Sequence, residues 1–237
     1  MFDFCSIASL GPRRSLLRLG AALVLIAGCL HPVLAVTALA PALRAELESA
    51  VADYEAGRNG PAAAAFMSLA ERGVAAAQYN LAVMHLRGEL PGASRAVARQ
   101  LAQRAAEGGF VTAQFMLAHG LENGDFGMRD LAAAQGWYEI AATGGSVEAQ
   151  VAIGTAYYLG RGRTRDFALA ARWYREAAKG GDIGAMYLLA SMYEQGDGVE
   201  RDLRLARYWY AAAAYAGDEA APMKVKELDA QLAGQPG

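Results

Sequence analysis

The chain has 237 residues with 22 basic and 24 acidic side chains, so its net charge of −2 offers no positive excess for nucleic acid. No run of lysine or arginine follows Arg18 either. Both cysteines, Cys5 and Cys29, lie near the N-terminus, which excludes disulfides, thiolate metal sites and cysteine nucleophiles from the residues that follow.

Residues 1–35 have the pattern of a signal peptide or an N-terminal membrane anchor. Arg13, Arg14 and Arg18 precede a run over 19–43 without Lys, Arg, Asp or Glu, in which His31 is the one basic side chain. A basic start followed by an apolar stretch predicts export. A buried N-terminal helix is the competing interpretation, but the stretch shows no amphipathic pattern. The adjacent arginines fit both the general export route and the twin-arginine route.

Three fates of this segment stay open. A signal peptidase could cleave after Val33-Leu34-Ala35, or Ile26-Ala27-Gly28-Cys29 could act as a bacterial lipobox that places a lipid on Cys29. The uncharged run is also long enough to span a bilayer uncleaved. Since the arginines stay inside, all three fates place the rest of the chain in the periplasm or cell envelope.

Residues 36–237 follow a 36-residue period, which predicts an array of repeats. Glycine recurs at this step, and alanine follows four residues later. A second glycine series, an aspartate series and a Trp-Tyr pair keep the same step. The members are Gly73, Gly109, Gly145, Gly181 and Gly217; Ala77, Ala113, Ala149, Ala185 and Ala221; Gly88, Gly124, Gly160 and Gly196; Asp130, Asp166 and Asp202; and Trp137-Tyr138, Trp173-Tyr174 and Trp209-Tyr210.

Each series suits one place in a pair of helices. Apolar residues between Gly109 and Gly124 fall at helical spacing, which predicts a first helix, helix A, ended by Gly124 in the left-handed conformation. Asp130 suits the N-cap of a second helix, helix B, which ends at Gly145. The alanines let the two helices lie close together, and the tryptophans fill the wider gaps.

We therefore predict an all-α fold, because one helix pair cannot bury its apolar face alone and must stack on its neighbours. The repeat domain covers 36–237. It comprises an atypical pair with a tight turn over 42–72, four repeats over 73–216 and a more polar capping helix over 219–232.

The string from Gly196 to Asp202, with Trp209-Tyr210 after it, resembles the Sel-one-like repeat, a relative of the tetratricopeptide repeat, and the stretch around Gly160-Arg-Gly162 matches it equally well. The resemblance implies a right-handed α-solenoid of antiparallel helix pairs with adaptor or regulatory roles. The first repeat departs from the pattern, with Ser94 in place of the aspartate and Leu101-Ala102 in place of Trp-Tyr. Phe126 replaces a loop glycine in the next repeat. We expect looser packing, or remodelling for a partner, at these places.

The side of helix A opposite its buried face carries aromatic side chains that water alone would not require. In solenoids of the resembled family the A helices line the concave wall, so we predict a partner-binding groove there. Packing against the next A helix is an equally good interpretation for the series that begins at Tyr79. The predicted groove residues are Tyr79, Val83, Leu86, Phe115, His119, Glu122, Thr155, Tyr158, Tyr187, Ser191 and Glu194.

Catalytic and metal-binding patterns are missing from the sequence. His119 and Glu122 could share a metal, but a surface histidine is the simpler interpretation, and His85 occupies a different position in its repeat. We therefore predict no metal, no cofactor and no enzymatic activity, and an exported scaffold that binds a protein or peptide. An envelope enzyme or accessory module acting on cell-wall material is the alternative, and self-association through the exposed ends is a third possibility.

Overall fold

The computed structural model describes residues 39–234, and this part of the chain is helical, with short turns and no strand. The sequence predictions for residues 1–35, including the export signal and the lipid on Cys29, lie outside the described residues. No helix in the described range is both long enough and apolar enough to cross a membrane.

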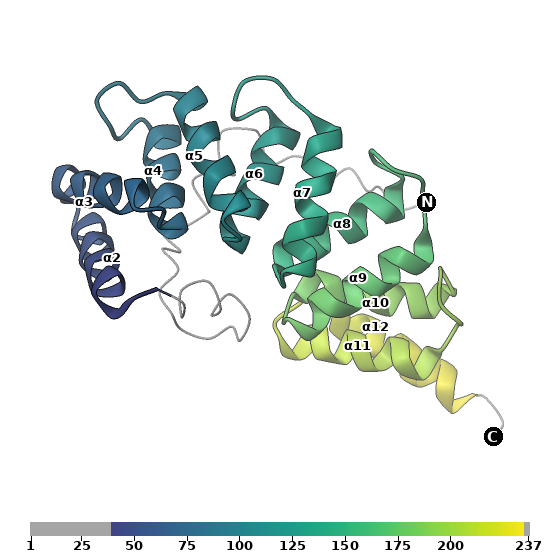
Figure 1. Ribbon diagram of the computed structural model, residues 1–237. Helices are drawn as coiled ribbons and strands as arrows, with labels where there is room; N and C mark the ends of the chain where they lie inside the picture. The colour runs from purple at the N-terminus through teal and green to yellow at the C-terminus, as the bar shows by residue number, and fades with distance from the viewer. Residues whose placement is uncertain (1–38, 235–237) are drawn as a thin grey trace.

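The helices form consecutive pairs along a curved array, with α2 and α3 at one end and α11 and α12 at the other (Figure 1). Each helix packs against the helix before it and the helix after it. The predicted all-α solenoid is therefore confirmed. The N-terminal pair is α2 (Pro41–Glu55) and α3 (Asn59–Glu71). The A helices are α4 (Ala75–Arg87), α6 (Val111–Asn123), α8 (Val147–Leu159) and α10 (Ile183–Gln195). The B helices are α5 (Arg95–Glu107), α7 (Leu131–Thr143), α9 (Phe167–Lys179) and α11 (Leu203–Tyr215), and α12 (Ala221–Ala233) follows them.

The A helices end on glycine in the left-handed conformation, as the sequence predicts. Gly124 has a φ of +81°, and its equivalents at 88, 160 and 196 have the same conformation. Side chains with a Cβ resist this conformation, so glycine ends the helix at little cost. An arginine completes two of these ends, because Arg129 Nε donates to the carbonyl of Glu122 at 2.7 Å and Arg201 Nε to that of Glu194 at 3.0 Å.

The B helices begin at the predicted aspartate caps. The carboxylate of Asp130 accepts from the backbone N–H of Ala133, and that of Asp166 from the N–H of Leu169, both at 2.9 Å. Ser94 takes the same place in the first repeat, and its hydroxyl accepts from Val97 at the longer distance of 3.4 Å. Each such cap stabilises a helix by about 1 kcal/mol.

The core between the helices is built from small residues. The alanines at 77, 113, 149 and 185 are completely buried, as expected for the closest contacts between helices. A second buried series of small residues stands five positions later, with Ala82, Ala118, Gly154 and Ala190. At Gly154 even a Cβ would come within 3.0 Å of the Tyr174 ring. Trp137, Trp173 and Trp209 are half-buried and pack at the edges of the hydrophobic clusters.

A glutamine near the start of three A helices ties neighbouring repeats together. The amides of Gln78 and Gln114 donate to the carbonyls of Ala70 and Ala106 at the end of the preceding helix, at 3.2 and 3.1 Å. Gln150 makes the equivalent bond at 3.2 Å. Met186 occupies this position in the fourth repeat and has no amide to donate. The contact between α9 and α10 therefore forms without this hydrogen bond.

The loop that carries Phe126 is packed, which corrects the expectation of looser packing there. The Phe126 side chain is buried, and its ring lies over Gly120 so closely that a Cβ at Gly120 would come within 2.1 Å of it. A large residue in the loop is thus matched by a missing side chain on α6. Ala102, which stands where other repeats have tyrosine, is also completely buried.

Candidate functional site

The four aromatic residues predicted to line the groove are half-buried, and each ring contacts another aromatic ring. Tyr79 meets Phe110, the residue that precedes α6 of the next repeat, with ring centroids 5.4 Å apart. The other three meet rings of their own repeat, in the pairs Phe115–Tyr138, Tyr158–Phe167 and Tyr187–Tyr210, at 5.9, 5.1 and 4.9 Å. Burial raises the pKa of the Tyr79, Tyr158 and Tyr187 hydroxyls. These rings therefore contribute to packing and present only part of their surface to a partner.

The two glutamates of the predicted groove point towards helix B and the following unit. Glu122 accepts a hydrogen bond of 2.7 Å from the Tyr138 hydroxyl and pairs with Arg161 at 3.2 Å. Glu194 is held in the same way, by the Tyr210 hydroxyl at 2.8 Å and by Lys224 of α12 at 3.2 Å. Both carboxylates are thereby committed to contacts within the array.

In the remaining repeats other residues occupy the place of these glutamates. Leu86 packs against the hydrophobic core of the first repeats. In the third repeat, where Tyr158 stands at the glutamate position, the Thr155 hydroxyl and the Tyr174 hydroxyl lie 3.0 Å apart. Burial is the main cause that raises the pKa of Tyr174 to about 12. The series that begins at Leu86 thus serves the contact between helix A and helix B.

The series that begins at Val83 lies at the border of the exposed surface. Val83, His119, Thr155 and Ser191 are all half-buried. The His119 ring lies against Phe115, with centroids 5.9 Å apart, and its nitrogens are 3.0–3.1 Å from the Asn123 amide. The structure thus separates the eleven predicted residues: the series at Val83 borders open surface, and the other two pack against neighbouring helices.

Four positions further on, each A helix has an exposed residue that sequence reasoning missed. This series consists of Arg87, Asn123, Leu159 and Gln195, and all four are exposed. Four residues turn a helix by about 40°. The exposed side of helix A is rotated relative to the predicted side, because helix B of the same repeat covers one flank of helix A and the preceding repeat covers another. Together with the series at Val83, these residues form what we call the A-helix face.

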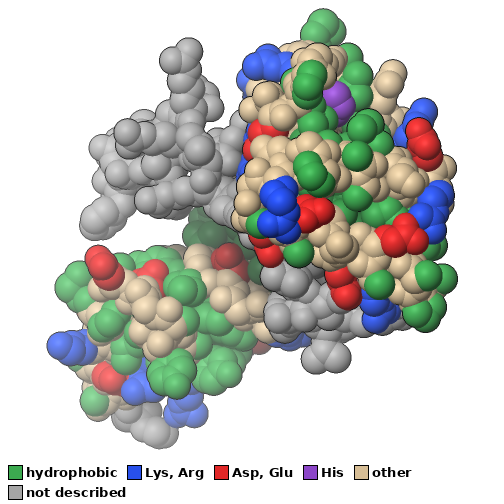
Figure 2. Space-filling view, turned by 90° about the vertical axis from the view of Figure 1, so that its left-hand side faces the viewer, with side chains coloured by type: hydrophobic (Ala, Val, Ile, Leu, Met, Phe, Trp, Pro, Cys, Tyr) green, Lys and Arg blue, Asp and Glu red, His purple; other side chains and the backbone are tan. Residues whose placement is uncertain are grey.

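The A-helix face is mostly uncharged and rich in hydrogen-bonding side chains. Amides, hydroxyls and one imidazole alternate with aliphatic side chains, and Arg87 is the one permanent charge among its eight residues. Figure 2 shows acidic and basic side chains scattered among hydrophobic ones on the side that it presents, without a broad patch of one sign. Such a surface suits contacts with polypeptide rather than with a highly charged ligand.

The histidines that the sequence offers as metal ligands make other contacts in the described part of the chain. No group of three or more histidine, cysteine, aspartate or glutamate side chains is placed to hold a metal within residues 39–234. His119 is 3.8 Å from Asp125, while Glu122 is engaged with Tyr138. His85 accepts the backbone N–H of Ser94 through Nδ1 at 3.3 Å, and burial lowers its pKa. Its role is to hold the turn between α4 and α5.

The fold and this surface define the chain as an α-helical repeat protein of the solenoid class. The Sel1 repeat matches it over four contiguous stretches, residues 75–110, 111–146, 147–182 and 183–218, which together exceed half its length. The chain therefore belongs to the Sel1 repeat family, whose members are generally non-catalytic scaffolds that bind protein partners.

Two crystal structures support this assignment. A Sel1 repeat protein from Oxalobacter formigenes is 34% identical, with a TM-score of 0.66, over 71% of this chain and 49% of its own. The protective antigen c5321 of uropathogenic Escherichia coli, which has the same fold, is 31% identical, with a TM-score of 0.72, over 78% of this chain and 41% of its own. This chain thus spans about half the length of these relatives or less. A search of curated proteins gave no match.

Proposed function

We propose that this chain is an exported scaffold that binds a segment of another protein along the A-helix face. The observation that carries the proposal is the series of Asn123, Leu159 and Gln195, one exposed residue in each of the last three A helices. Arg87 holds this position in the first repeat, where it donates to the Tyr54 hydroxyl of α2 at 2.9 Å. Leu159 and Gln195 lie on this exposed surface, and Asn123 lies there beside His119, 3.0–3.1 Å from its ring nitrogens. These three residues can meet a partner at the surface of the array.

The spacing of the face suits an extended peptide. Each A helix packs on the helix before it and the helix after it rather than on the next A helix. Packed helices lie about 8–10 Å apart, and an extended chain rises about 3.3 Å per residue. Equivalent residues on successive A helices, at most two such helix spacings apart, would therefore meet the bound segment about every three to six residues. Side-chain amides such as those of Asn123 and Gln195 can both donate to and accept from a peptide backbone. Aliphatic residues such as Val83 and Leu159 would supply apolar contacts between them.

Photo-crosslinking in living cells tests the binding surface. A photoreactive phenylalanine analogue at Asn123 of the full-length chain should yield a discrete adduct with one partner. The same analogue at Arg172, on the outward side of α9, is the matched control and should yield none. Competition by an excess of the identified partner segment should remove the Asn123 adduct. Equal adducts at both positions, or none at Asn123, would contradict the proposal.

The location outside the cytoplasm rests on the basic and apolar pattern of residues 1–35. A reporter enzyme that is active only in the cytoplasm, fused after residue 237, should be silent. A bright cytoplasmic signal would overturn the proposed export. Labelling with a radioactive fatty acid, compared between the wild type and Cys29→Ser, distinguishes a lipid anchor from a cleaved signal or a retained span.

A further inference from the structure

The outward side of α11 differs from that of the other B helices. Leu205, Tyr208, Ala212 and Tyr215 follow one another at intervals of three, four and three residues, so they form one stripe along the helix. Leu205, Tyr208 and Tyr215 are 40%, 60% and 97% exposed. We call these four residues the α11 stripe. Its most exposed members are both tyrosines, which are enriched where proteins bind one another.

The repeat itself does not require this stripe. The core side of α11 is formed by Ala206, Tyr210 and Ala213, which are buried. At the stripe positions, α9 and α5 carry mostly charged and polar residues, and α7 carries mostly small ones. These residues are Leu169, Arg172, Glu176 and Lys179 in α9; Val97, Gln100, Arg104 and Glu107 in α5; and Ala133, Gly136, Ile140 and Thr143 in α7. The two exposed tyrosines are therefore specific to the last B helix.

We propose that the α11 stripe is a self-association surface on which α11 of a second copy packs antiparallel across a two-fold axis level with residue 210. The intervals read the same in both directions, as a two-fold interface requires, because each partner offers the same surface. Leu205 then lies opposite Tyr215 of the second copy, and Tyr208 lies opposite Ala212 of the second copy. Each tyrosine faces a smaller side chain, so the two surfaces complement each other in size.

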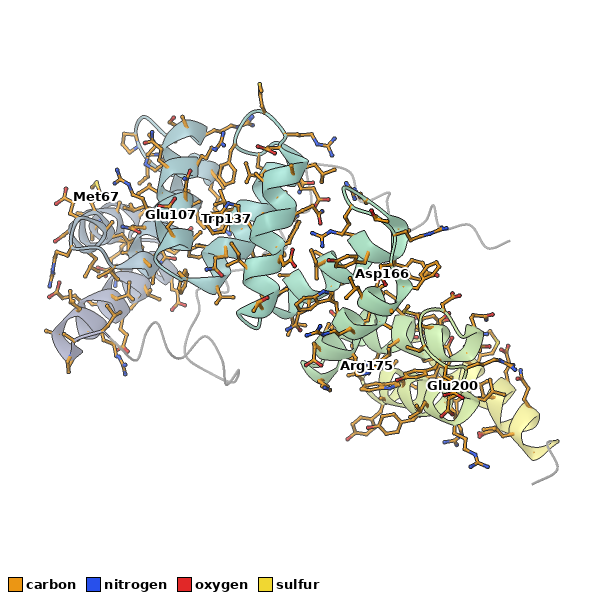
Figure 3. The ribbon with its side chains drawn as sticks, turned by 45° about the vertical axis from the view of Figure 1, so that its right-hand side comes forward. Met67, Glu107, Trp137, Asp166, Arg175 and Glu200 are labelled. Carbon is orange, nitrogen blue, oxygen red and sulfur yellow. The ribbon has the colours of Figure 1, made fainter. Side chains whose placement is uncertain are left out.

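Charges at the two ends of α11 favour the same orientation. Arg201 precedes the helix and Glu219 follows it, at equal distances in sequence from residue 210, and both are exposed. The antiparallel arrangement brings each Arg201 near Glu219 of the other copy, which favours this pairing over a parallel one. Glu200 lines a depression beside Arg175 of α9 (Figure 3), and Arg201 and Leu205 line the same depression, so it borders one end of the stripe.

One tyrosine of the stripe is already positioned by its neighbour. The Tyr208 ring stands edge-on to Trp209, with centroids 5.2 Å apart and planes at 80°. A side chain that is ordered before binding loses less conformational freedom in the complex. The thirteen-residue helix is about 20 Å long. A single pair of such helices buries less area than the ~1,600 Å² of a standard stable interface, so the dimer is weak. It forms when copies are concentrated together.

This surface is separate from the A-helix face, so the inference goes beyond the proposed function and can fail independently of it. The test uses two full-length chains with different tags, co-expressed and mildly oxidised, with Tyr208→Cys in one and Ala212→Cys in the other. A mixed-tag disulfide dimer should form at least ten times more abundantly than with Arg172→Cys and Glu176→Cys, the matched positions one repeat earlier. Tagged wild-type chains, whose only cysteines are Cys5 and Cys29, measure the background cross-linking from those two residues.

Two further variants decide between specific pairing and random collision. Tyr215→Lys in both chains should lower the 208–212 cross-link at least tenfold while leaving the thermal unfolding of the protein unchanged, since Tyr215 is almost fully exposed. Two chains that both carry Tyr208→Cys should cross-link weakly. The proposal is overturned by a 208–212 yield at the control level, by a yield insensitive to Tyr215→Lys, or by stronger 208–208 than 208–212 cross-linking.

Discussion

The first and fourth repeats build the same helix pair with different side-chain contacts. Where the fourth joins its helices through the Tyr210 hydroxyl and Glu194, the first has Ala102 and Leu86 at the same places. The first repeat has a hydrogen bond from the Gln78 side-chain amide to the preceding helix, and the fourth repeat lacks this bond.

Both repeats keep a glycine at the end of helix A, a buried alanine near its start and a capping side chain at the start of helix B. The architecture therefore depends on backbone geometry and close approach. The polar links between helices can be exchanged, because each adds only a modest stabilisation. Substitutions that separate these two kinds of contribution can test this comparison.

The largest effect is expected from glycines in the loops of the two repeats. Gly198 has a φ of +68°, and a Cβ there would lie 2.2 Å from the backbone of Phe167. Gly92, in the loop of the first repeat, has a φ of +71° with nothing within 4 Å. Gly92→Ala should cost about 1–2 kcal/mol for the left-handed conformation alone. Gly198→Ala should cost roughly 1–3 kcal/mol more, because the loop and the backbone at Phe167 must also move apart to make room for the methyl group.

Chemical denaturation of the two glycine variants provides the measurement. Equal losses of unfolding free energy would show that the loop of the fourth repeat moves away freely, contrary to the close approach seen at Phe167.

The hydroxyl link of the fourth repeat should give the next largest effect. Tyr210→Phe removes the donor to Glu194 and leaves the ring in place, so it should lower the free energy of unfolding by about 1–2 kcal/mol. Tyr208→Phe on the same helix is the matched control. Its side chain is 60% exposed, and it should change stability by no more than about 0.5 kcal/mol.

The same hydroxyl predicts a pH dependence. Burial, and then the hydrogen bond to Glu194, raises the pKa of Tyr210 above the ordinary value of 10.0. Above pH 10 the unfolded chain loses this proton while the folded chain keeps it, so stability falls as the pH rises further. Unfolding measured from pH 9 to pH 11 should show a shallower decline for Tyr210→Phe than for the wild type. Parallel curves would argue against the raised pKa.

The helix caps should distinguish the repeats by a smaller amount. Asp202 accepts from two backbone N–H groups at 2.9 Å, whereas Ser94 accepts from one at 3.4 Å. Asp202→Ala should cost about 1 kcal/mol, and Ser94→Ala about 0.5 kcal/mol. Thermal unfolding of the two variants under one condition gives the comparison, and a larger loss for Ser94→Ala would reverse the expected order.

The smallest effect is expected from restoring the glutamine at the joint before α10. Met186→Gln should stabilise the protein by about 0.5 kcal/mol or less, by adding a side-chain hydrogen bond equivalent to the one from Gln114 to the Ala106 carbonyl. The gain is limited because the amide oxygen has to be accommodated as well. At Gln150 this atom is buried without a hydrogen-bond partner. A clear loss of stability in denaturant titration would show that the joint depends on apolar packing by Met186.

Backbone signals in the sequence predicted the fold because each acts within its own repeat. Gly124 and Asp130 need only their neighbouring residues to end one helix and start the next. The arginine series at 129 and 201 and the glutamine series at 78, 114 and 150 are equally periodic, yet their roles were missed. Their partners are carbonyl groups in other turns or in the preceding repeat, which a sequence pattern does not display.

The candidate site was harder to predict than the fold for a geometric reason. Placing the free side of helix A opposite Ala77 and Leu81 assumes one neighbouring helix, but helix A has neighbours on two sides. The exposed arc is therefore centred nearer Asn123 and Gln195 than Tyr79 and Tyr187. Phe126 was misjudged in a similar way, because its matching vacancy at Gly120 can be recognised only when the loop is folded onto α6.

The bonds between repeats have a consequence for how such a protein can change in length. The link from Gln150 to Ala142 joins residues only eight apart, and the pair of Glu122 with Arg161 reaches just into the next repeat. A 36-residue segment duplicated in frame would recreate the glutamine link at its new boundary wherever the duplicated repeat carries that glutamine. The ion pair would depend on which two repeats become neighbours, because Asp125 and Asp197 stand at the position of Arg161 in the second and fourth repeats. Because contacts of such short range form quickly, the added segment could also fold as it leaves the ribosome, without waiting for distant parts of the chain. Gene duplication could thus lengthen the surface one helix pair at a time, with selection acting on binding rather than on foldability.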